Sequence, residues 1–148
     1  MWTIRKTMVI DRPVKEIFGY ASNPVNWYQF YVGLSEPENL EGNGEVGTTM
    51  DMKYTMLGLH LPITLEVTKN SREGNSCFWS GQIKGAVSST QSWTYNAEGT
   101  GTEVNLYMEY ELPGSVLGKV ANKLVVQKLM DNSLEQTMNN LKDICETD

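Results

Sequence analysis

Residues that bind metal ions or act as nucleophiles are scarce in this chain. Its 148 residues include one histidine, His60, and two cysteines, Cys77 and Cys145, which form no closely spaced pair. A structural zinc site needs about four such ligands, so we expect no metal, and we assign no cofactor and no catalytic residue. Cys77 with His60 is a formal alternative, as a nucleophile and its base. The simpler interpretation is a small strand residue at Cys77 and a helix-end residue at Cys145.

Long apolar runs and an excess of positive charge are also missing. No segment approaches the ~20 apolar residues that span a bilayer, and residues 1–6 lack the apolar core of a signal peptide. The formal net charge of -6 argues against nucleic acid and anionic membranes as partners, because basic surfaces bind phosphate groups. We therefore expect a cytoplasmic protein without stable membrane insertion. A length of 148 residues is typical of one domain, here residues 1–148.

The longest helical pattern in the sequence runs from Gly114 to Cys145. Its apolar residues recur mostly at spacings of three and four: Val116, Val120, Leu124, Val126, Met130, Leu134, Met138, Leu141 and Cys145. The first three lie about a quarter turn from the others at ~100° per residue, which predicts a bend between Asn122 and Lys128. Such a helix is not stable by itself, so an apolar surface must cover its stripe.

The residues before this helix show the alternation of β-strands. After a first strand over 3–10, Pro13 and Pro24 predict the starts of two short helices. Six further strands are expected, at 35–40, 48–56, 61–71, 75–80, 85–97 and 102–112. Short turns join them, so the sheet should be antiparallel. One face is polar, and the terminal helix is the element long enough to cover the other, which predicts an α+β fold.

This order of elements resembles the START-like superfamily, which includes the polyketide cyclase/dehydrase and lipid-transport families. The resemblance spans the whole chain and rests on segments 13–18, 23–27, 101–104, 110–114 and 134–142 in this order. It implies the helix-grip fold: a curved, seven-stranded antiparallel sheet wrapped around a long C-terminal helix, with a cavity between them. The superfamily includes carriers, receptors, cyclases and hydrolases, so the resemblance implies a fold rather than one function.

The implied cavity should be lined by residues on the inner faces of the strands and the helix. The candidate ligand-binding residues are Met50, Met52, Tyr54, Leu65, Ser89, Gln91, Trp93, Met108, Tyr110, Val126, Met130 and Leu134. Flexible methionines suit a pocket that adapts to apolar ligands, although they also fill irregular cores. Gln91 is the strongest candidate for orienting a ligand, because a buried amide needs partners. The alternative is that the polar side chains bond one another or water.

Two turns are candidates for the entrance to the cavity. In ligand-binding relatives, the turns after the third and fifth strands act as gates, and here these positions match residues 57–62 and 81–85. Their apolar character is unusual for turns and places the gate at Leu57, Leu59, His60 and Ile83. His60 is alternatively an ordinary exposed turn residue.

Three functions are compatible with the sequence. The first is noncatalytic binding or transport of a small hydrophobic or amphipathic molecule, such as a lipid, an isoprenoid, a quinone or a polyketide-like aromatic compound. The second is an enzyme of the cyclase/dehydrase type, in which a tyrosine or His60 moves protons. The third is a protein-interaction module that uses an exposed Phe78 or Trp79, only one of which can face inward. A wide apolar cavity favours the first, a carboxylate or histidine inside it the second, and a fully packed interior the third.

Overall fold

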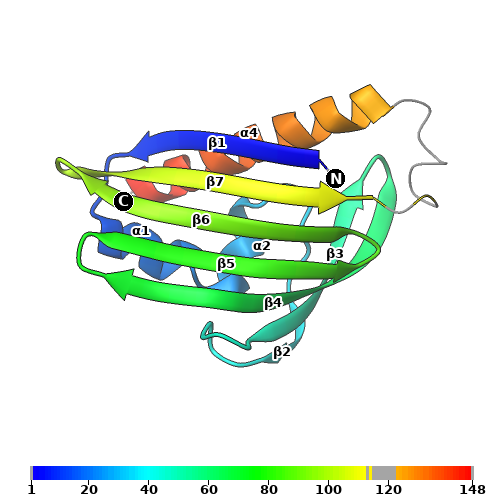
Figure 1. The fold of residues 1–148 in the computed structure, drawn as a ribbon, viewed down its shortest axis with the longest axis horizontal. Helices are drawn as coiled ribbons and strands as arrows, with labels where there is room; N and C mark the ends of the chain where they lie inside the picture. The colour runs from blue at the N-terminus through cyan, green and yellow to red at the C-terminus, as the bar shows by residue number, and fades with distance from the viewer. Residues whose placement is uncertain (1, 113, 115–122, 148) are drawn as a thin grey trace.

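The computed structural model describes residues 2–112, 114 and 123–147. The elements are β1 (Trp2–Ile10), α1 (Val14–Ala21), the 3-10 helix η1 (Pro24–Asn26), α2 (Trp27–Phe30), β2 (Glu38–Glu41), β3 (Thr49–Met56), β4 (Leu59–Glu73), β5 (Ser76–Gly85), β6 (Ser88–Glu98), β7 (Gly101–Glu111) and α4 (Lys123–Glu146). The strands form one antiparallel 7-stranded sheet in the order β1-β7-β6-β5-β4-β3-β2 (Figure 1). This architecture confirms the expected helix-grip fold.

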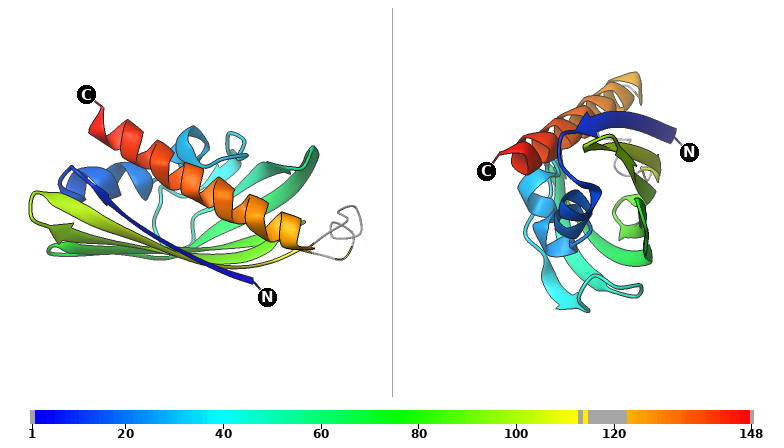
Figure 2. Two further views of the ribbon diagram at one scale, coloured as in Figure 1. Left: turned by 90° about the horizontal axis from the view of Figure 1, so that it is seen from above. Right: turned by 90° about the vertical axis from the view of Figure 1, so that its left-hand side faces the viewer.

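The described helices α1, η1, α2 and α4 lie on one side of the sheet, which curves around them (Figure 2). The face of α4 that meets the sheet carries the later part of the predicted stripe: Val126, Met130, Leu134, Met138 and Leu141 are buried. Leu124, which was expected on this stripe, is instead 71% exposed. The expected helical residues Val116 and Val120 lie outside the described residues, as does the first position of the expected bend. From Lys123 onward α4 is uninterrupted.

Proline and asparagine start the short helices as the sequence predicts. Pro13 precedes α1 in an extended conformation, and its fixed φ suits a helix start. Asn23 caps η1 by accepting a hydrogen bond from the Val25 N–H at 3.3 Å, with Pro24 as the first helical residue. The Trp27 indole then donates to the Ala21 carbonyl at 2.9 Å. This bond joins the start of α2 to the end of α1 and holds both beneath α4.

The two predicted gate turns are shorter than expected or absent. In the first, only Leu57 and Gly58 form a turn, and β4 already begins at Leu59. Pro62 does not end this strand: its carbonyl accepts from the Ala86 N–H at 3.0 Å, on the side where β5 has just ended. A backbone N–H at position 62 would point to the same side, so the sheet loses no internal hydrogen bond there.

The second gate prediction is wrong in its secondary structure. Residues 81–85 continue β5, and the chain bends at Ala86 and Val87 instead. Ile83 pairs with Ser89 across the sheet and is a buried inner-face residue rather than a turn residue. The two glycines that suggested a turn have other roles: Gly81 lies under an aromatic ring, and Gly85 has a positive φ of 115° where the strand ends.

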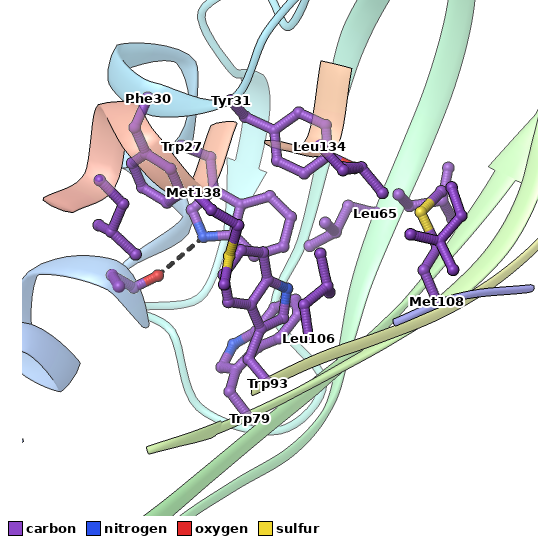
Figure 3. Close-up of a cluster of buried hydrophobic side chains, with 14 of the residues drawn as sticks. Trp27, Phe30, Tyr31, Leu65, Trp79, Trp93, Leu106, Met108, Leu134 and Met138 are labelled. Atoms are coloured by element: carbon purple, nitrogen blue, oxygen red, sulfur yellow. Dashed lines mark hydrogen bonds between the residues drawn. The ribbon is translucent and has the colours of Figure 1, made fainter. Parts of the chain in front are cut away.

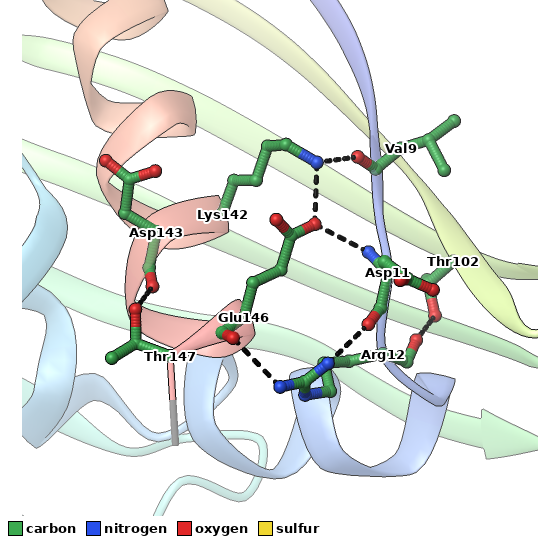
Figure 4. A network of polar contacts seen from close by, with 8 residues as sticks. All are labelled: Val9, Asp11, Arg12, Thr102, Lys142, Asp143, Glu146 and Thr147. Atoms are coloured by element: carbon green, nitrogen blue, oxygen red, sulfur yellow. Dashed lines mark hydrogen bonds and ion pairs between the residues drawn. The ribbon is translucent and has the colours of Figure 1, made fainter.

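Polar contacts hold the C-terminal end of α4 against the β1–α1 connection (Figure 4). The Glu146 carboxylate accepts from the Asp11 N–H at 2.8 Å and from Lys142 Nζ at 2.6 Å. Lys142 also donates to the Val9 carbonyl at 2.9 Å, and Arg12 donates to the Glu146 carbonyl at 2.8 Å. We call this group the C-terminal clamp. It positions the helix over the end of the sheet that carries α1.

Candidate ligand-binding site

The interior between α4 and the sheet is divided into an aromatic part and a methionine-rich part. The aromatic part, which we call the aromatic cluster, consists of Phe18, Trp27, Tyr31, Trp79, Trp93 and Tyr95. Its three indoles gather around Met138, with Trp79 and Trp93 below it, while Met108 lies apart from them on the other side of Leu106 (Figure 3). All six rings are at most 7% exposed. The cluster therefore fills the part of the interior that lies next to α1 and α2.

The methionine-rich part encloses a small cavity. Its lining comes from α2 and the following loop, from β3 to β7 and from α4: Trp27, Tyr31, Leu34, Met52, Tyr54, Ile63, Ile83, Val87, Ser89, Met108 and Met130. The volume is about 20 Å³, which is room for roughly one water molecule. The wide cavity expected from the sequence is thus reduced to a small apolar space, because the aromatic cluster and the methionines fill most of the interior.

The predicted site residues fall into two groups around this cavity. Those in its wall are Met52, Tyr54, Ser89, Met108 and Met130, together with Ile83 from the predicted gate. The others are buried in the core without forming part of the wall: Met50, Leu65, Gln91, Trp93, Tyr110, Val126 and Leu134. The remaining gate residues lie at the β3–β4 turn, where Leu57 is 45% exposed, Leu59 is half-buried and His60 is exposed.

Gln91 has its hydrogen-bonding partners within the aromatic cluster. Its amide nitrogen donates to the Tyr31 hydroxyl at 2.7 Å, and its amide oxygen accepts from the Trp93 indole at 3.1 Å. All three side chains are buried. The arrangement corresponds to the alternative considered above, in which buried polar groups bond one another. Gln91 thus joins two rings of the core and does not border the cavity.

Ser89 presents the polar atom of the cavity that most needs a partner. The residue is 4% exposed, and no described residue supplies a hydrogen bond to its hydroxyl oxygen. A buried hydroxyl without a partner costs roughly 1–3 kcal/mol. The Tyr54 hydroxyl, also in the wall, donates only to the Met130 sulfur at 3.3 Å, which is a weak acceptor. Both hydroxyls are therefore available to a stronger partner inside the cavity.

The tyrosines of the wall remain protonated at neutral pH. Burial raises the pKa of Tyr54 to about 12. Burial also raises the pKa of Tyr31, with a smaller contribution from the nearby Tyr54. A phenol with a raised pKa is a weaker acid but an intact hydrogen-bond donor. These groups suit the recognition of a carbonyl or hydroxyl oxygen better than proton transfer.

Groups suited to acid–base catalysis lie elsewhere in the structure. Among the described lining residues there is no histidine, cysteine, aspartate or glutamate. His60 is exposed at the start of β4, where its ring nitrogen bonds the Thr55 hydroxyl at 2.9 Å. Cys77 lies near the start of β5, opposite Arg72 at the end of β4 and Tyr95 on β6. His60 is at the start of β4, so the two residues lie at opposite ends of the sheet and the formal Cys77–His60 pair is not assembled. In the described part of the chain, no group of three or more acidic, histidine or cysteine side chains is placed to hold a metal ion.

The orientation of the Phe78–Trp79 pair is now defined. Trp79 faces inward and is 1% exposed. Phe78 is on the outer face, half-buried, with the Lys69 ammonium 5.8 Å from its ring centroid. A large exposed aromatic surface, which would favour an interaction module, is not formed by these two residues.

Sequence reasoning missed five residues of the cavity wall, namely Trp27, Tyr31, Leu34, Ile63 and Val87. Ile63 and Val87 were assigned to the inner face but not to a site. The sequence favours Trp27 and Tyr31 as anchors of the second short helix, although Trp27 was also considered as a ring that could stack on a ring-shaped ligand. The aromatic spacing in 27–31 was a usable signal, since a short helix with this many rings must lie against the core.

Comparison with protein families gives a match over nearly the whole chain. The profile described as polyketide cyclase / dehydrase and lipid transport matches residues 1–146. The chain belongs to this family. A search among curated proteins found none that matches it.

Solved structures agree with this assignment at the level of the fold. A START superfamily protein from Mycobacterium smegmatis has a TM-score of 0.74 at 15% identity, with 97% of each chain covered. A Thermus thermophilus protein has a TM-score of 0.74 at 20% sequence identity, also with 97% of each chain covered. An aromatase/cyclase from a Streptomyces species has a TM-score of 0.73 at 8% sequence identity, and the match covers 98% of this chain and 93% of the aromatase/cyclase chain. At these identities the similarity shows the shared fold alone.

No helix in the described residues of this family member combines the length and apolar character required to cross a membrane.

Proposed function

We propose that this family member binds a small, mainly apolar molecule that carries a hydroxyl or carbonyl group, without transforming it chemically. The observation that carries the proposal is Ser89: a buried hydroxyl, without a partner among the described residues, in the wall of an otherwise apolar cavity. A ligand oxygen next to Ser89 and Tyr54 would satisfy both hydroxyls. The family assignment supports the binding of an apolar molecule, because the family description includes lipid transport.

The small volume of the cavity requires that side chains move when a ligand enters. Three of the lining residues are methionines: Met52, Met108 and Met130. Each has three rotatable bonds and a polarizable sulfur, so the wall can expand at a modest energetic cost. Burial of the apolar part of the ligand against these side chains would provide most of the affinity, at roughly 25 cal/mol per Å².

The two other functions receive less support from the described residues. A cyclase or dehydrase would need a group that moves protons, and the described lining offers only phenols with raised pKa values. The nearly filled interior, with a cavity of about 20 Å³, is the feature that favours an interaction module. The module considered above would however expose Phe78 or Trp79, and Trp79 is buried while Phe78 is half-buried. Binding without chemistry is consequently the function that the lining favours.

Native mass spectrometry of the purified protein tests this proposal. We expect a co-purified small molecule that is released on denaturation. Ser89→Leu should abolish its retention, because the larger apolar side chain fills the cavity and removes the hydroxyl. Thr90→Leu is the matched control, since Thr90 is the next residue of β6 and is exposed on the outer face. Equal retention by the wild type and Ser89→Leu, or no bound molecule in the wild type, would contradict the proposal.

A further inference from the structure

Gly81 is a buried inner-face position in the middle of β5 that has no side chain. It lies between Trp79 and Ile83, which both face inward, and it pairs with Gln91 on β6 and Val67 on β4. The backbone does not need a glycine here, because a positive φ occurs at other glycines and not at this one. The reason for the glycine must therefore be the space above it.

The Trp79 indole occupies that space. A Cβ atom built on Gly81 would collide with Trp79 Cη2 and would lie 3.1 Å from both Cζ2 and Cζ3. The indole therefore leans along β5 from its own position toward Ile83. Ile83 and its cross-strand partner Ser89 both belong to the cavity wall. The ring thus extends from the aromatic cluster over Gly81, toward the side of the interior where Ile83 lines the cavity.

The contacts of Trp79 are made by packing alone. Its indole nitrogen is buried and finds no hydrogen-bond acceptor among the described residues. Its ring lies against Trp27 with centroids 4.6 Å apart, and Trp27 stacks on Tyr31 at 5.7 Å. Both of these neighbours line the cavity. By contrast, the Trp27 and Trp93 indoles each donate a hydrogen bond. Trp79 is therefore the indole whose position depends on shape and not on a polar partner.

We propose that Trp79, seated over Gly81, sets the depth of the ligand pocket and so the size of the ligand. The inference rests on the proposed function, because it concerns how far a bound molecule extends. With the indole in place, a ligand whose oxygen lies at Ser89 has room only on the methionine side. Without it, the space over Gly81 joins the cavity and accepts a longer apolar group.

A series of 1-alkanols measures this depth. The hydroxyl group provides an oxygen for Ser89. The length of the alkyl chain, varied from hexanol to dodecanol, measures how far the pocket extends. In isothermal titration calorimetry of the full chain, affinity should rise with each carbon up to a limit and then stop rising. Trp79→Ala should move this limit to chains at least two carbons longer and bind those chains at least tenfold more tightly. Trp79→Phe, which is milder for folding, should give an intermediate limit.

The neighbouring residue provides the control for this series. Phe78→Ala removes an aromatic ring from the outer face of the same strand and should leave the limit unchanged. An unchanged limit in Trp79→Ala, with alkanols still bound by the wild type, would overturn the depth inference and leave the proposed function standing. If only Trp79→Ala binds alkanols, the inference is supported. If neither protein binds them, the inference is overturned, and co-purification then decides the proposed function separately.

A ligand-independent test uses the steric relationship between the two residues. Gly81→Ala should lower the melting temperature of the wild type by about 5 °C, because the new Cβ displaces the indole. In the Trp79→Ala background the same substitution should have almost no effect. Such non-additivity identifies the two residues as a coupled pair. Equal effects of Gly81→Ala in both backgrounds would overturn the inference.

Discussion

The two ends of the interior are built by the same sheet and the same helix, yet they are filled differently. Next to α1 and α2, indole and phenol rings pack on one another, and the Trp93–Gln91–Tyr31 hydrogen bonds hold several of them in place. Toward the β3–β4 turn, methionines surround a small cavity, and no residue in the described part of the chain bonds the Ser89 hydroxyl there. Rigid rings can fill space completely, whereas unbranched side chains leave it adjustable. We therefore propose that the first end mainly provides stability and the second binds the ligand, with Trp27 and Tyr31 bordering both.

The two ends of α4 also differ in how firmly they are attached to the rest of the structure. Its C-terminal end is held by the clamp around Glu146 (Figure 4). Near its start, Leu124 and Val125 are 71% and 52% exposed. Between the two ends, the Lys6 ammonium bridges Asp131 and Glu135 at 3.0 Å each. The helix is thus most firmly attached over the aromatic cluster, where the interior is also most completely filled.

The largest effect is expected for Trp93→Ala. The residue is 2% exposed in the centre of the aromatic cluster, so its removal leaves a large void and an unpaired Gln91 oxygen. We expect a loss of about 3–5 kcal/mol in the free energy of unfolding, measured with urea. Trp2→Ala is the matched control at the other end of the sheet, where the indole is half-buried, and it should cost less than half as much. Equal losses would remove the distinction between the two ends.

Gln91→Leu should affect stability and leave binding unchanged. The substitution takes the hydrogen-bond partner from both Tyr31 and Trp93 inside the core. We expect a destabilisation of about 1–3 kcal/mol in urea unfolding, with unaltered retention of the bound molecule. Gln82→Leu, on the outer face of β5, should stay within about 0.5 kcal/mol of the wild type. A loss of ligand in Gln91→Leu would show that the hydrogen bond from Gln91 to Tyr31, which lines the cavity, also supports binding.

Ser89→Ala should have a smaller effect on stability and in the opposite direction. Removing a buried hydroxyl without a partner among the described residues should raise the free energy of unfolding by up to about 1 kcal/mol. The affinity for an alcohol or ketone should fall roughly two- to tenfold, as measured by calorimetry. Thr102→Val provides the contrast: the Thr102 hydroxyl donates to the Arg12 carbonyl at 2.8 Å, so its loss should destabilise. Destabilisation by Ser89→Ala would mean that the hydroxyl supports the fold.

The smallest effect concerns the clamp and depends on pH. The Asp11 N–H, followed by the Lys142 side chain, lowers the pKa of Glu146 from its ordinary value of 4.5. A lowered pKa adds stability above the ordinary value, and this stability is lost as the pH falls through the folded-state pKa. The melting temperature of Glu146→Gln should therefore lie below that of the wild type at about pH 7 and approach it at about pH 3. Glu98→Gln, at the β6–β7 turn, is the control; a deficit independent of pH would exclude the charge as the cause.

Much of this architecture could be predicted from the alternation of apolar and polar residues and from the positions of the prolines. The period-two pattern placed Met50, Met52 and Tyr54 on the inner face, and all three are buried. Pro13 and Pro24 located the short helices correctly. These signals succeed because each is local: a strand or helix has its own period, and proline acts on its own backbone.

The failures came where a residue's role depended on a neighbour that is distant in the sequence. Pro62 suggested a turn but lies where β5 has ended, so it causes no loss of sheet hydrogen bonds. Gly81 suggested a second turn but provides space for an indole. For Gln91 the sequence left two roles open, contact with a ligand or hydrogen bonds to other polar groups, and its partners in the structure are Tyr31 and Trp93. None of these relationships is visible within a short window of sequence.

The amino-acid pattern by itself determined which faces of the strands and of α4 are apolar, since side-chain direction follows from the period of each element. It also determined that these faces must cover one another, because neither is stable in water. How much space remains between them was decided only in three dimensions. That space is the small difference between the volume enclosed by sheet and helix and the volume of the side chains inside. The Trp79 indole over Gly81 is an example, because it occupies space that a side chain at position 81 would otherwise fill.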